Sequence, residues 1–413
     1  MGIYKYLLCI IAVLSFFKAF SQQGALTIAR RPRLANYSNI AVVDSPRQID
    51  LVDVIQKILD KKPQPSKRAL PKKVNFSVIP YGGYTLSTGL TINLSGNVGF
   101  FTNAGHQQNL SVIAADAGYD SKIQKTFRTR SEIWANDNSF KFVTDLRYEI
   151  YPTDTYGLGT FTTFTEDNNI DYRYVRTYGA ALKKIAGDYY AGMGYNFDYY
   201  YDITATGNLN AGISDFIKYG QTPSSKSSGI NFDFLYDNRK NRLNPLKGTF
   251  ASIIFRDNFT FLGSGADWQS VQFDLREYIK LSSLSNNVLA LWGIAEFTSG
   301  GVPYLNLPST GSDMYNNSGR GYAVGRFRGK NELYLEAEYR FGITHDGLLG
   351  AVVFANAESF SELQSNAFEG LAPAAGTGVR IKLNKHSDTN ICIDYGIGMG
   401  GSRGFFLNLG EVF

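Results

Sequence analysis

The sequence has few residues of the kinds that build covalent cross-links and metal centres. It contains two cysteines, Cys9 and Cys392, and three histidines that lie far apart along the chain. Cys9 falls within an apolar run at the N-terminus that we expect to be removed, so only one thiol is left and no internal disulfide framework can form. Three separate histidines do not provide a histidine-rich metal site. We therefore expect no disulfide, no metal ion and no cofactor.

Long apolar segments are also scarce. The chain opens MGIYKYLLCIIAVLSFFKAFSQQ, in which Lys5 precedes an apolar core and Ala19-Phe20-Ser21 provides a small-x-small cleavage site. This pattern predicts a secretory signal peptide over residues 1–21. No other segment approaches the roughly 20 apolar residues of a membrane-spanning helix. Two classes are left, an exported soluble protein or a β-barrel of an outer membrane.

Positive charge is confined to the first part of the chain. The formal net charge is +5, yet residues 22–75 hold eleven Lys and Arg against four Asp and Glu, and the signal peptide holds two more lysines. Residues 76–413 are therefore left with a net charge of −4. A nucleic-acid partner would require a basic face on the folded domain. We expect no nucleic-acid partner.

The basic segment 22–75 is predicted to contain one amphipathic helix, at about 46–62. Ser45-Pro46-Arg47-Gln48 has the form of a capping box with proline at the first helical position, and a basic, proline-containing linker follows the helix. Because one apolar stripe needs a surface to cover, three placements stay open: against the next domain, as a plug inside a barrel, or on a membrane surface. The stripe consists of Leu51, Val52, Ile55, Ile58 and Leu59.

Residues 76–413 alternate between apolar and polar side chains with the period of a β-strand. In one such run Leu335 and Ala337 share one face, and Glu336 and Glu338 share the other. Charged and amide side chains recur on the polar faces, which the wet lumen of a barrel tolerates and the dry core of a sandwich does not. We therefore predict an all-β fold, a transmembrane antiparallel β-barrel of about 16 strands over residues 76–413.

Two short matches to catalytic motifs occur near the C-terminus. Residues 396–401 fit GxGxxG and residues 400–404 fit GxSxG, and both motifs require a helix to follow the glycines. Strand-like alternation follows here instead, so we interpret these residues as glycines of a tight turn. We predict no catalytic residue and no enzyme activity.

Four other motifs follow one another in the second half of the chain. They are Asp237 and Arg239 with Asn244, Pro245 and Gly248; the tripeptide Arg320-Gly321-Tyr322; the acidic strand that contains Glu338; and a last strand with Gly404, Phe405, Leu407, Leu409 and Phe413. Together they resemble the bacterial surface antigen superfamily, the outer-membrane assembly barrels typified by BamA and TamA. The resemblance covers about 229–413.

This resemblance implies a location and a function. It implies a barrel in the outer membrane of a Gram-negative bacterium, in contact with outer-membrane lipid, which assists the insertion or translocation of outer-membrane or surface proteins. Its partners would be outer-membrane or periplasmic proteins of an assembly complex, and its clients unfolded barrel or surface proteins. A passive pore or a structural barrel subunit without assembly activity is the alternative.

The chain departs from the family pattern at two places. Asn356 stands where family members often carry the acid that pairs with the loop arginine. The segment 22–75 is too short for even one of the periplasmic POTRA modules that usually precede the barrel, so we expect a BamA/TamA-like barrel that lacks them.

The resemblance also suggests how the arginine loop is used. We expect Arg320 to enter the lumen and meet Glu338, with Asn356 adding a hydrogen bond and Tyr322 packing alongside. The alternative is a solvated surface loop. We also expect the last strand, up to Phe413, to close the barrel, because an open edge is costly in lipid.

Overall fold

The computed structural model describes residues 48–59, 74–85, 89–102, 108–163, 168–206, 214–283, 285–385 and 387–413. The expected signal peptide, residues 1–21, and the middle of the predicted linker lie outside these ranges. Residues Pro46–Phe413 form one compact unit.

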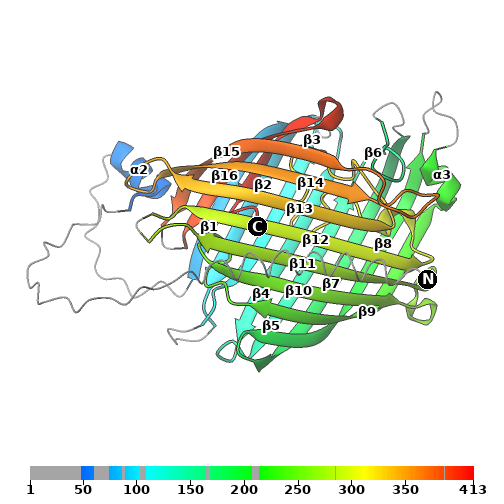
Figure 1. The fold of residues 1–413 in the computed structure, drawn as a ribbon, viewed down its shortest axis with the longest axis horizontal. Coiled ribbons are helices and arrows are strands. Elements are labelled where there is room, and N and C mark those ends of the chain that lie inside the picture. The colour runs from blue at the N-terminus through cyan, green and yellow to red at the C-terminus, as the bar shows by residue number, and fades with distance from the viewer. Residues whose placement is uncertain are drawn as a thin grey trace, which may run out of the picture. The chain divides into compact units, whose positions relative to one another are not determined.

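The unit is a single antiparallel sheet of seventeen strands that closes on itself (Figure 1). Each strand pairs with the next along the chain, except that β5 and β6 follow one another in the same line and both pair with β7. The wall thus has sixteen positions, which confirms the predicted fold and strand number. The strands are β1 (Val74–Thr85), β2 (Gly89–Phe100), β3 (Ser111–Asp120), β4 (Lys125–Ala135), β5 (Phe140–Ile150), β6 (Thr153–Thr155), β7 (Asn168–Ala186), β8 (Tyr189–Ala205), β9 (Ser224–Asp237), β10 (Gly248–Asn258), β11 (Trp268–Lys280), β12 (Val288–Gly300), β13 (Asn331–Gly342), β14 (Leu349–Phe360), β15 (Ala372–Asn384), β16 (Thr389–Gly398) and β17 (Arg403–Leu409).

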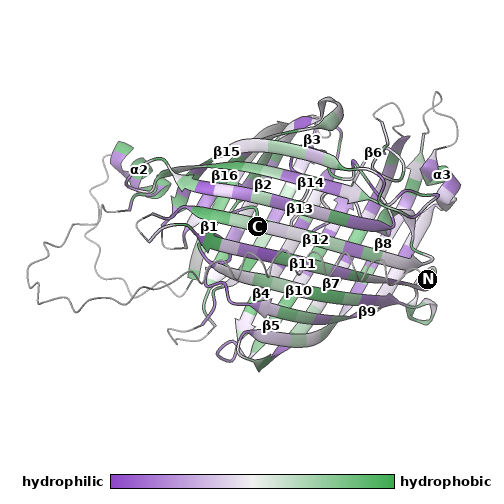
Figure 2. Ribbon diagram, viewed as in Figure 1, coloured by the Kyte–Doolittle hydropathy of each residue, from purple (hydrophilic) through white to green (hydrophobic). Residues whose placement is uncertain are grey.

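The alternation of the sequence becomes the two faces of the wall. Along β13, Glu336 and Glu338 are buried inside, whereas Leu335 is exposed on the outside. Figure 2 shows the same change between hydrophobic and hydrophilic residues along strand after strand. An apolar outer surface over a charged interior is the arrangement of a barrel in a lipid bilayer. The exposed apolar side chains of the wall include Phe76, Leu90, Ile92, Leu94, Phe127, Met193, Phe232, Phe234, Ile253, Leu335, Val353, Ile397 and Phe405.

The sheet is weakly closed where its two ends meet. In the described strands, β1 and β17 share one register pair, Thr85 with Gly404. The neighbouring ladders are long, since β1 pairs with β2 along its whole length and β17 pairs with β16 from Arg403 to Leu409. We call this junction of β1 and β17 the seam.

Within the described residues, two helices and three 3-10 turns are not part of the sheet. Figure 1 shows α2 at one end of the barrel and α3 at the other, and we name the two ends after them. None of the helices within the described ranges is both long and apolar enough to cross a bilayer. The elements are α2 (Leu51–Ile58), α3 (Asp215–Gly220), η2 (Thr260–Leu262), η3 (Tyr304–Asn306) and η4 (Met399–Gly401).

Helix α2 is shorter than the predicted helix at 46–62. Its N-cap is Asp50, whose carboxylate accepts the backbone N–H of Asp53 at 2.9 Å, while the Asp53 carboxylate accepts the N–H of Asp50 at 3.3 Å. This pair forms the capping box in place of the one predicted at Ser45-Pro46-Arg47-Gln48. Gln48 is already outside the helix, and residues 45–47 and 60–62 lie outside the described ranges.

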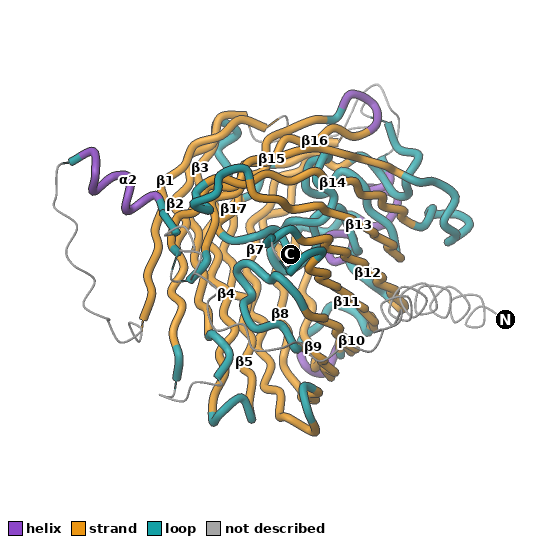
Figure 3. Tube along the Cα trace, turned by 60° about the vertical axis from the view of Figure 1, so that its left-hand side comes forward, coloured by secondary structure: helices purple, strands orange, loops and turns teal. Residues whose placement is uncertain are grey.

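Helix α2 is attached to two hairpin turns at its end of the barrel. The N–H of Ile49 donates to the carbonyl of Asp346 at 3.1 Å, in the turn between β13 and β14. The N–H of Lys385, in the turn between β15 and β16, donates to Asp50 at 3.1 Å. In Figure 3 the helix extends away from the ring of strands and not across its opening. Of the three placements left open, the plug is therefore the one this arrangement disfavours.

Candidate functional site

The segment 301–330, which we call the lumen loop, joins β12 to β13 and folds back into the barrel. The carboxylate of Asp313 organises its turn by accepting the backbone N–H groups of Tyr315, Asn317 and Ser318 at 2.7–2.9 Å. A carboxylate that satisfies three buried backbone donors fixes the local backbone strongly. The loop therefore presents its tip, residues 320–322, in a defined conformation.

Arg320 lies at this tip and is 1% exposed. Its guanidinium forms ion pairs with Glu336 and Glu338 of β13 and with Asp394 of β16. The loop is therefore internal and not the solvated surface loop of the alternative interpretation. Glu338 was the predicted partner, whereas Glu336 and Asp394 were not predicted. The alternation of β16 does place Asp394 on the polar face of that strand.

Asn356 and Phe354 of β14 complete the surroundings of Arg320. The amide Nδ2 of Asn356 donates to the Arg320 carbonyl at 2.9 Å, and the guanidinium carbon lies 3.8 Å from the centroid of the Phe354 ring. The amide thus holds the loop backbone, while the acidic partners come from β13 and β16. Where the family often has an acid, Asn356 carries no charge, and the negative charge around Arg320 comes from carboxylates on other strands.

The ion pairs of Arg320 continue as a network toward the C-terminus. Arg340 pairs with Glu338 at 2.5 Å, Arg380 pairs with Asp394, and Arg380 also pairs with Glu411 at 2.8 Å. Burial by itself would lower the pKa of Arg320, but the adjacent carboxylates outweigh it and raise that pKa well above the ordinary value. Burial would likewise raise the pKa of Glu411, and Arg380 and Arg340 lower it instead. Both groups are therefore held in their charged forms.

The loop tip approaches the wall closely because the wall there is built of small residues. A Cβ on Gly321 would lie 2.7 Å from the Cβ of Ala374, and a Cβ on Gly398 would lie 2.4 Å from the ring of Tyr322. The Tyr322 hydroxyl donates to the carbonyl of Pro373 at 2.6 Å and accepts the N–H of Met399 at 2.9 Å. The arrangement therefore holds the tyrosine against β15 and β16 by shape and by hydrogen bonds.

The glycine motif near the C-terminus takes part in this contact. We interpreted residues 396–401 as a tight turn, and Gly400 and Gly401 do lie in a turn with positive φ angles of 63° and 81°. Gly396 and Gly398 instead belong to β16. Their part of the interpretation is wrong, because they are strand residues that make room for the loop.

We expect Gly398→Ala to weaken the docking of the loop, because the added methyl group would collide with Tyr322. Overpacking of this kind costs roughly 1–3 kcal/mol. The measurement is the urea concentration at which the folded, heat-modifiable form is lost. Gly179→Ala in β7 is the matched control, since a Cβ there meets nothing within 4 Å. Equal behaviour of the two variants would contradict the proposed close fit.

The turn between β9 and β10 carries the first family motif and lies at the α2 end. Arg239 donates from Nε and Nη2 to the carboxylate of Asp237 at 2.9 and 3.0 Å, and both residues are buried. Gly248 has a φ of 118°, a conformation that favours glycine, and buried Asn244 donates its N–H to Asn241 at 3.4 Å. Pro245 lies between them in the same turn. The motif therefore forms a rigid turn held by an internal ion pair.

The last strand ends earlier than the sequence analysis expected. Gly404, Phe405, Leu407 and Leu409 lie in β17, which stops at Leu409. Gly410, with a φ of 97°, then turns the chain inward. The final residues 411–413, which we call the C-terminal tail, follow this turn.

The last strand was expected to continue to Phe413, but this residue lies beyond the end of β17. Phe413 is buried in an apolar cluster, with its ring 5.0 Å from that of Trp292 and 6.1 Å from that of Tyr278. The Arg340 guanidinium donates to the Phe413 carbonyl oxygen at 3.1 Å. The tail is thus an internal element and not part of the outer surface.

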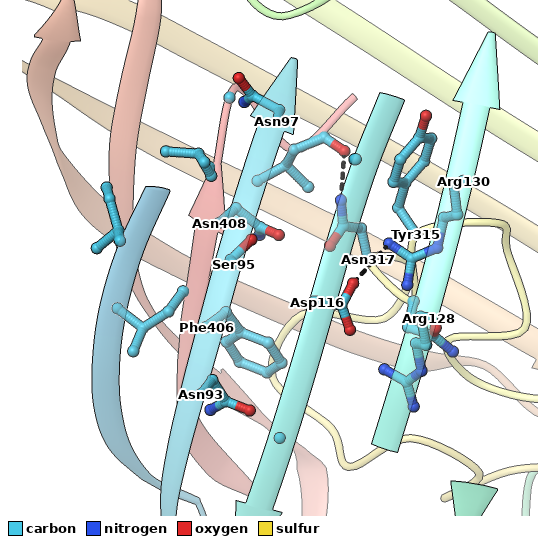
Figure 4. Close-up of a pocket in the computed structure, with 18 of the residues that line it drawn as sticks. Asn93, Ser95, Asn97, Asp116, Arg128, Arg130, Tyr315, Asn317, Phe406 and Asn408 are labelled. Carbon is cyan, nitrogen blue, oxygen red and sulfur yellow. Dashed lines mark hydrogen bonds and ion pairs between the residues drawn. The ribbon is translucent and has the colours of Figure 1, made fainter. Parts of the chain in front are cut away.

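A cavity of about 360 Å³ lies behind the seam, lined by β2, β3, β4, β17, the lumen loop and the C-terminal tail (Figure 4). Asn317 of the loop donates to the carbonyl of Val412 at 2.7 Å, and Arg130 pairs with Asp116 at 3.3 Å across its wall. Among the described residues, no three His, Cys, Asp or Glu side chains are placed to hold a metal ion. The cavity is a partly open space beside the junction of the first and last strands, and both polar and apolar side chains line it.

Comparisons with known proteins agree with this architecture. The family model of the Omp85 superfamily domain matches residues 81–406. No match is found among curated protein sequences.

Several solved barrels share the fold. BamA from Haemophilus ducreyi lacking POTRA domains 1-3 is similar, with a TM-score of 0.50, 14% identity, and coverage of 80% of this chain and 68% of that one. CdiB from Escherichia coli is also similar, with a TM-score of 0.52, 11% identity, and coverage of 83% and 63%. CdiB from Acinetobacter baumannii is similar too, with a TM-score of 0.50, 13% identity, and coverage of 82% of this chain and 60% of that one. This chain thus spans less than two thirds of either CdiB structure. The family model covers most of the chain, and the protein therefore belongs to the Omp85 superfamily.

Proposed function

We propose that this barrel assists the insertion or translocation of outer-membrane or surface proteins, within a complex in the outer membrane of a Gram-negative bacterium. The observation that carries the proposal is the seam, in which β1 and β17 share one register pair. A strand without a partner has free N–H and C=O groups on one side, and these groups can pair with an added strand. An incoming client strand would find such an edge on β17.

The contrast along β17 supports this role. On the edge that faces β16, β17 is paired along its whole length of seven residues, from Arg403 to Leu409. On the side of β1 the described pairing is limited to Gly404. Opening the seam therefore breaks few hydrogen bonds of the wall, whereas opening the next ladder would break many.

The lumen favours insertion over a passive pore. The lumen loop and the C-terminal tail both enter it, and buried ion pairs connect them across the interior. A conducting channel needs a continuous wet path, which these elements obstruct. The Omp85-family barrels that this chain resembles act as protein insertases or transporters. We propose likewise that its partners are outer-membrane or periplasmic proteins of an assembly complex and that its clients are unfolded barrel or surface proteins.

A cross-link across the seam tests the proposal. We expect a disulfide between Thr85→Cys and Gly404→Cys, which face each other in the register, to block the seam without disturbing the rest of the wall. The rate at which the reconstituted protein folds an unfolded barrel client into vesicles should fall roughly tenfold or more, or ~1.4 kcal/mol in the activation barrier. Reduction of the disulfide should restore the rate.

A second cross-link serves as the control. Thr144 and Gly179 are also a Thr–Gly register pair, but in the fully paired ladder of β5 and β7, and a Cβ on Gly179 meets nothing within 4 Å. The oxidised Thr144→Cys, Gly179→Cys variant should keep its activity. If the oxidised seam variant folds clients as fast as this control, the seam is not the site of insertion.

A further inference from the structure

Helix α2 is attached to the barrel by its acidic side. The Lys385 ammonium lies 2.5 Å from the Asp53 carboxylate, and the Lys385 N–H donates to Asp50. An amphipathic helix of a globular domain ordinarily does the reverse, because it buries its apolar stripe against its neighbours. At α2 the described hydrogen bonds and ion pair to the barrel are instead made by Asp50, Asp53 and the N–H of Ile49.

Four of the five side chains in the apolar stripe of α2 are exposed, and the fifth, Leu51, is half-buried. Val52 and Ile55 are each 47% exposed, Leu59 is 59% exposed and Ile58 is 76% exposed. At 100° per residue these four side chains fall on one arc of the helix, away from Asp53. Exposure of a contiguous apolar patch of this kind marks an interaction surface.

The hairpins that hold α2 belong to the lipid-facing wall. The β13–β14 hairpin carries the exposed Ile343 and Val353, and the β15–β16 hairpin carries the exposed Val379 and Ile393. The helix extends outward from the rim formed by these hairpins (Figures 1 and 3). The apolar stripe of the helix is thus close to the edge of the surface that the bilayer covers.

Positive charge accompanies the apolar stripe. Lys57 lies in the last turn of α2, and the sequence continues with further basic residues. Interfacial helices combine an apolar face with lysine and arginine, which are attracted to anionic lipid headgroups. The basic residues after the helix are Lys61, Lys62, Lys67, Arg68, Lys72 and Lys73.

We propose that α2 lies in the surface of the bilayer at the α2 end of the barrel, with Val52, Ile55, Ile58 and Leu59 in the boundary between headgroups and acyl chains. The occupant of this apolar face is a phospholipid surface with anionic headgroups. The Asp53–Lys385 ion pair and the hydrogen bonds of residues 49–50 orient the helix so that its stripe meets the lipid. The helix thereby anchors the β13–β14 and β15–β16 hairpins, which carry the partners of Arg320, to the membrane surface.

A pair of environment-sensitive probes tests this proposal. The full chain is folded into vesicles of phosphatidylethanolamine and phosphatidylglycerol with an NBD fluorophore on Ile58→Cys or on Gln56→Cys, and the unsubstituted chain gives the background labelling. Gln56 is exposed and, at 100° per residue, lies about 160° from Ile58 around the helix. Folding of each variant is checked by heat-modifiable migration.

We expect the probe at residue 58 to emit at shorter wavelength and to be quenched by nitroxide-labelled lipids. The probe at residue 56 should stay accessible to aqueous iodide. If iodide quenches both probes equally, the helix lies in water and the proposal is wrong. If the probe at residue 58 is shielded from both iodide and nitroxide lipid, protein covers it, either a second copy or another chain, and the proposal is again wrong.

Discussion

Replacing Arg320 by alanine is expected to destabilise the barrel by ~3–5 kcal/mol, because three buried carboxylates would lose their common cation. These carboxylates belong to Glu336, Glu338 and Asp394, each at most 4% exposed. The free energy of unfolding, measured by urea titration of the heat-modifiable form, reports the effect. Insertion activity should fall with it, because the loop tip no longer holds β13 against β16.

An exposed arginine gives the matched control. Arg173 pairs with Asp202 at 3.2 Å, but both side chains are about half exposed, at 49% and 60%. Exposed ion pairs contribute about 0–1 kcal/mol. Arg173→Ala should therefore leave the unfolding midpoint nearly unchanged. An Arg320→Ala variant as stable as Arg173→Ala would show that the loop arginine does not hold the lumen together.

A double-mutant cycle isolates the pair predicted from the sequence. Glu338→Gln alone should destabilise the protein, and in the presence of Arg320→Ala it should cost less, since the ion pair is already absent. Residues in contact give an interaction energy of about 0.5–3 kcal/mol in such cycles. Strict additivity of the two changes would rule out a direct energetic coupling between Arg320 and Glu338.

Removal of Arg403 to Phe413 is expected to prevent folding of the barrel. Without β17, the edge of β16 that pairs with it from Ile391 to Ile397 would lie unpaired in the bilayer, at several kcal/mol for each exposed backbone group. The truncated protein should show no heat-modifiable band in gel electrophoresis after refolding into vesicles. Normal heat-modifiable migration of this truncation would mean that β17 is not needed to close the wall.

A shorter truncation separates the strand from the tail. Deletion of Glu411 to Phe413 keeps β17 but removes the Phe413 ring from the Trp292 cluster and removes Glu411, one of the ion-pair partners of Arg380. We expect this variant to fold with a loss of about 3–5 kcal/mol, the usual cost of emptying a large buried aromatic site. Equal outcomes for the two deletions would argue against separate roles for strand and tail.

The sequence predicted the features that depend on local periodicity. The inward face of β13 follows from its alternation, and the ion pair of Arg320 with Glu338 follows once the loop is recognised by its motif. Asp394 could not be assigned as a third partner, because its contact with Arg320 depends on how far the loop reaches across the lumen. That reach depends on Gly396 and Gly398, whose motif is equally compatible with a turn.

The errors concern residues whose surroundings are set by tertiary structure. The alternating pattern of β17 would continue to Phe413 if the strand did, but the chain turns at Gly410 and Phe413 packs in the buried cluster around Trp292. The predicted cap at Ser45 is a good local motif, yet Asp50 caps the helix, where it can also bind the N–H of Lys385. In both cases a contact distant in sequence outweighs the local pattern.

The single register pair of the seam, Thr85 with Gly404, joins β1 to β17, the first and last strands of the barrel along the chain. Bringing such distant residues together carries a large loop-closure entropy, and contacts of this kind slow folding. Among the described ladders of the wall, the pairing that closes the largest loop is therefore also the one held by the fewest register pairs.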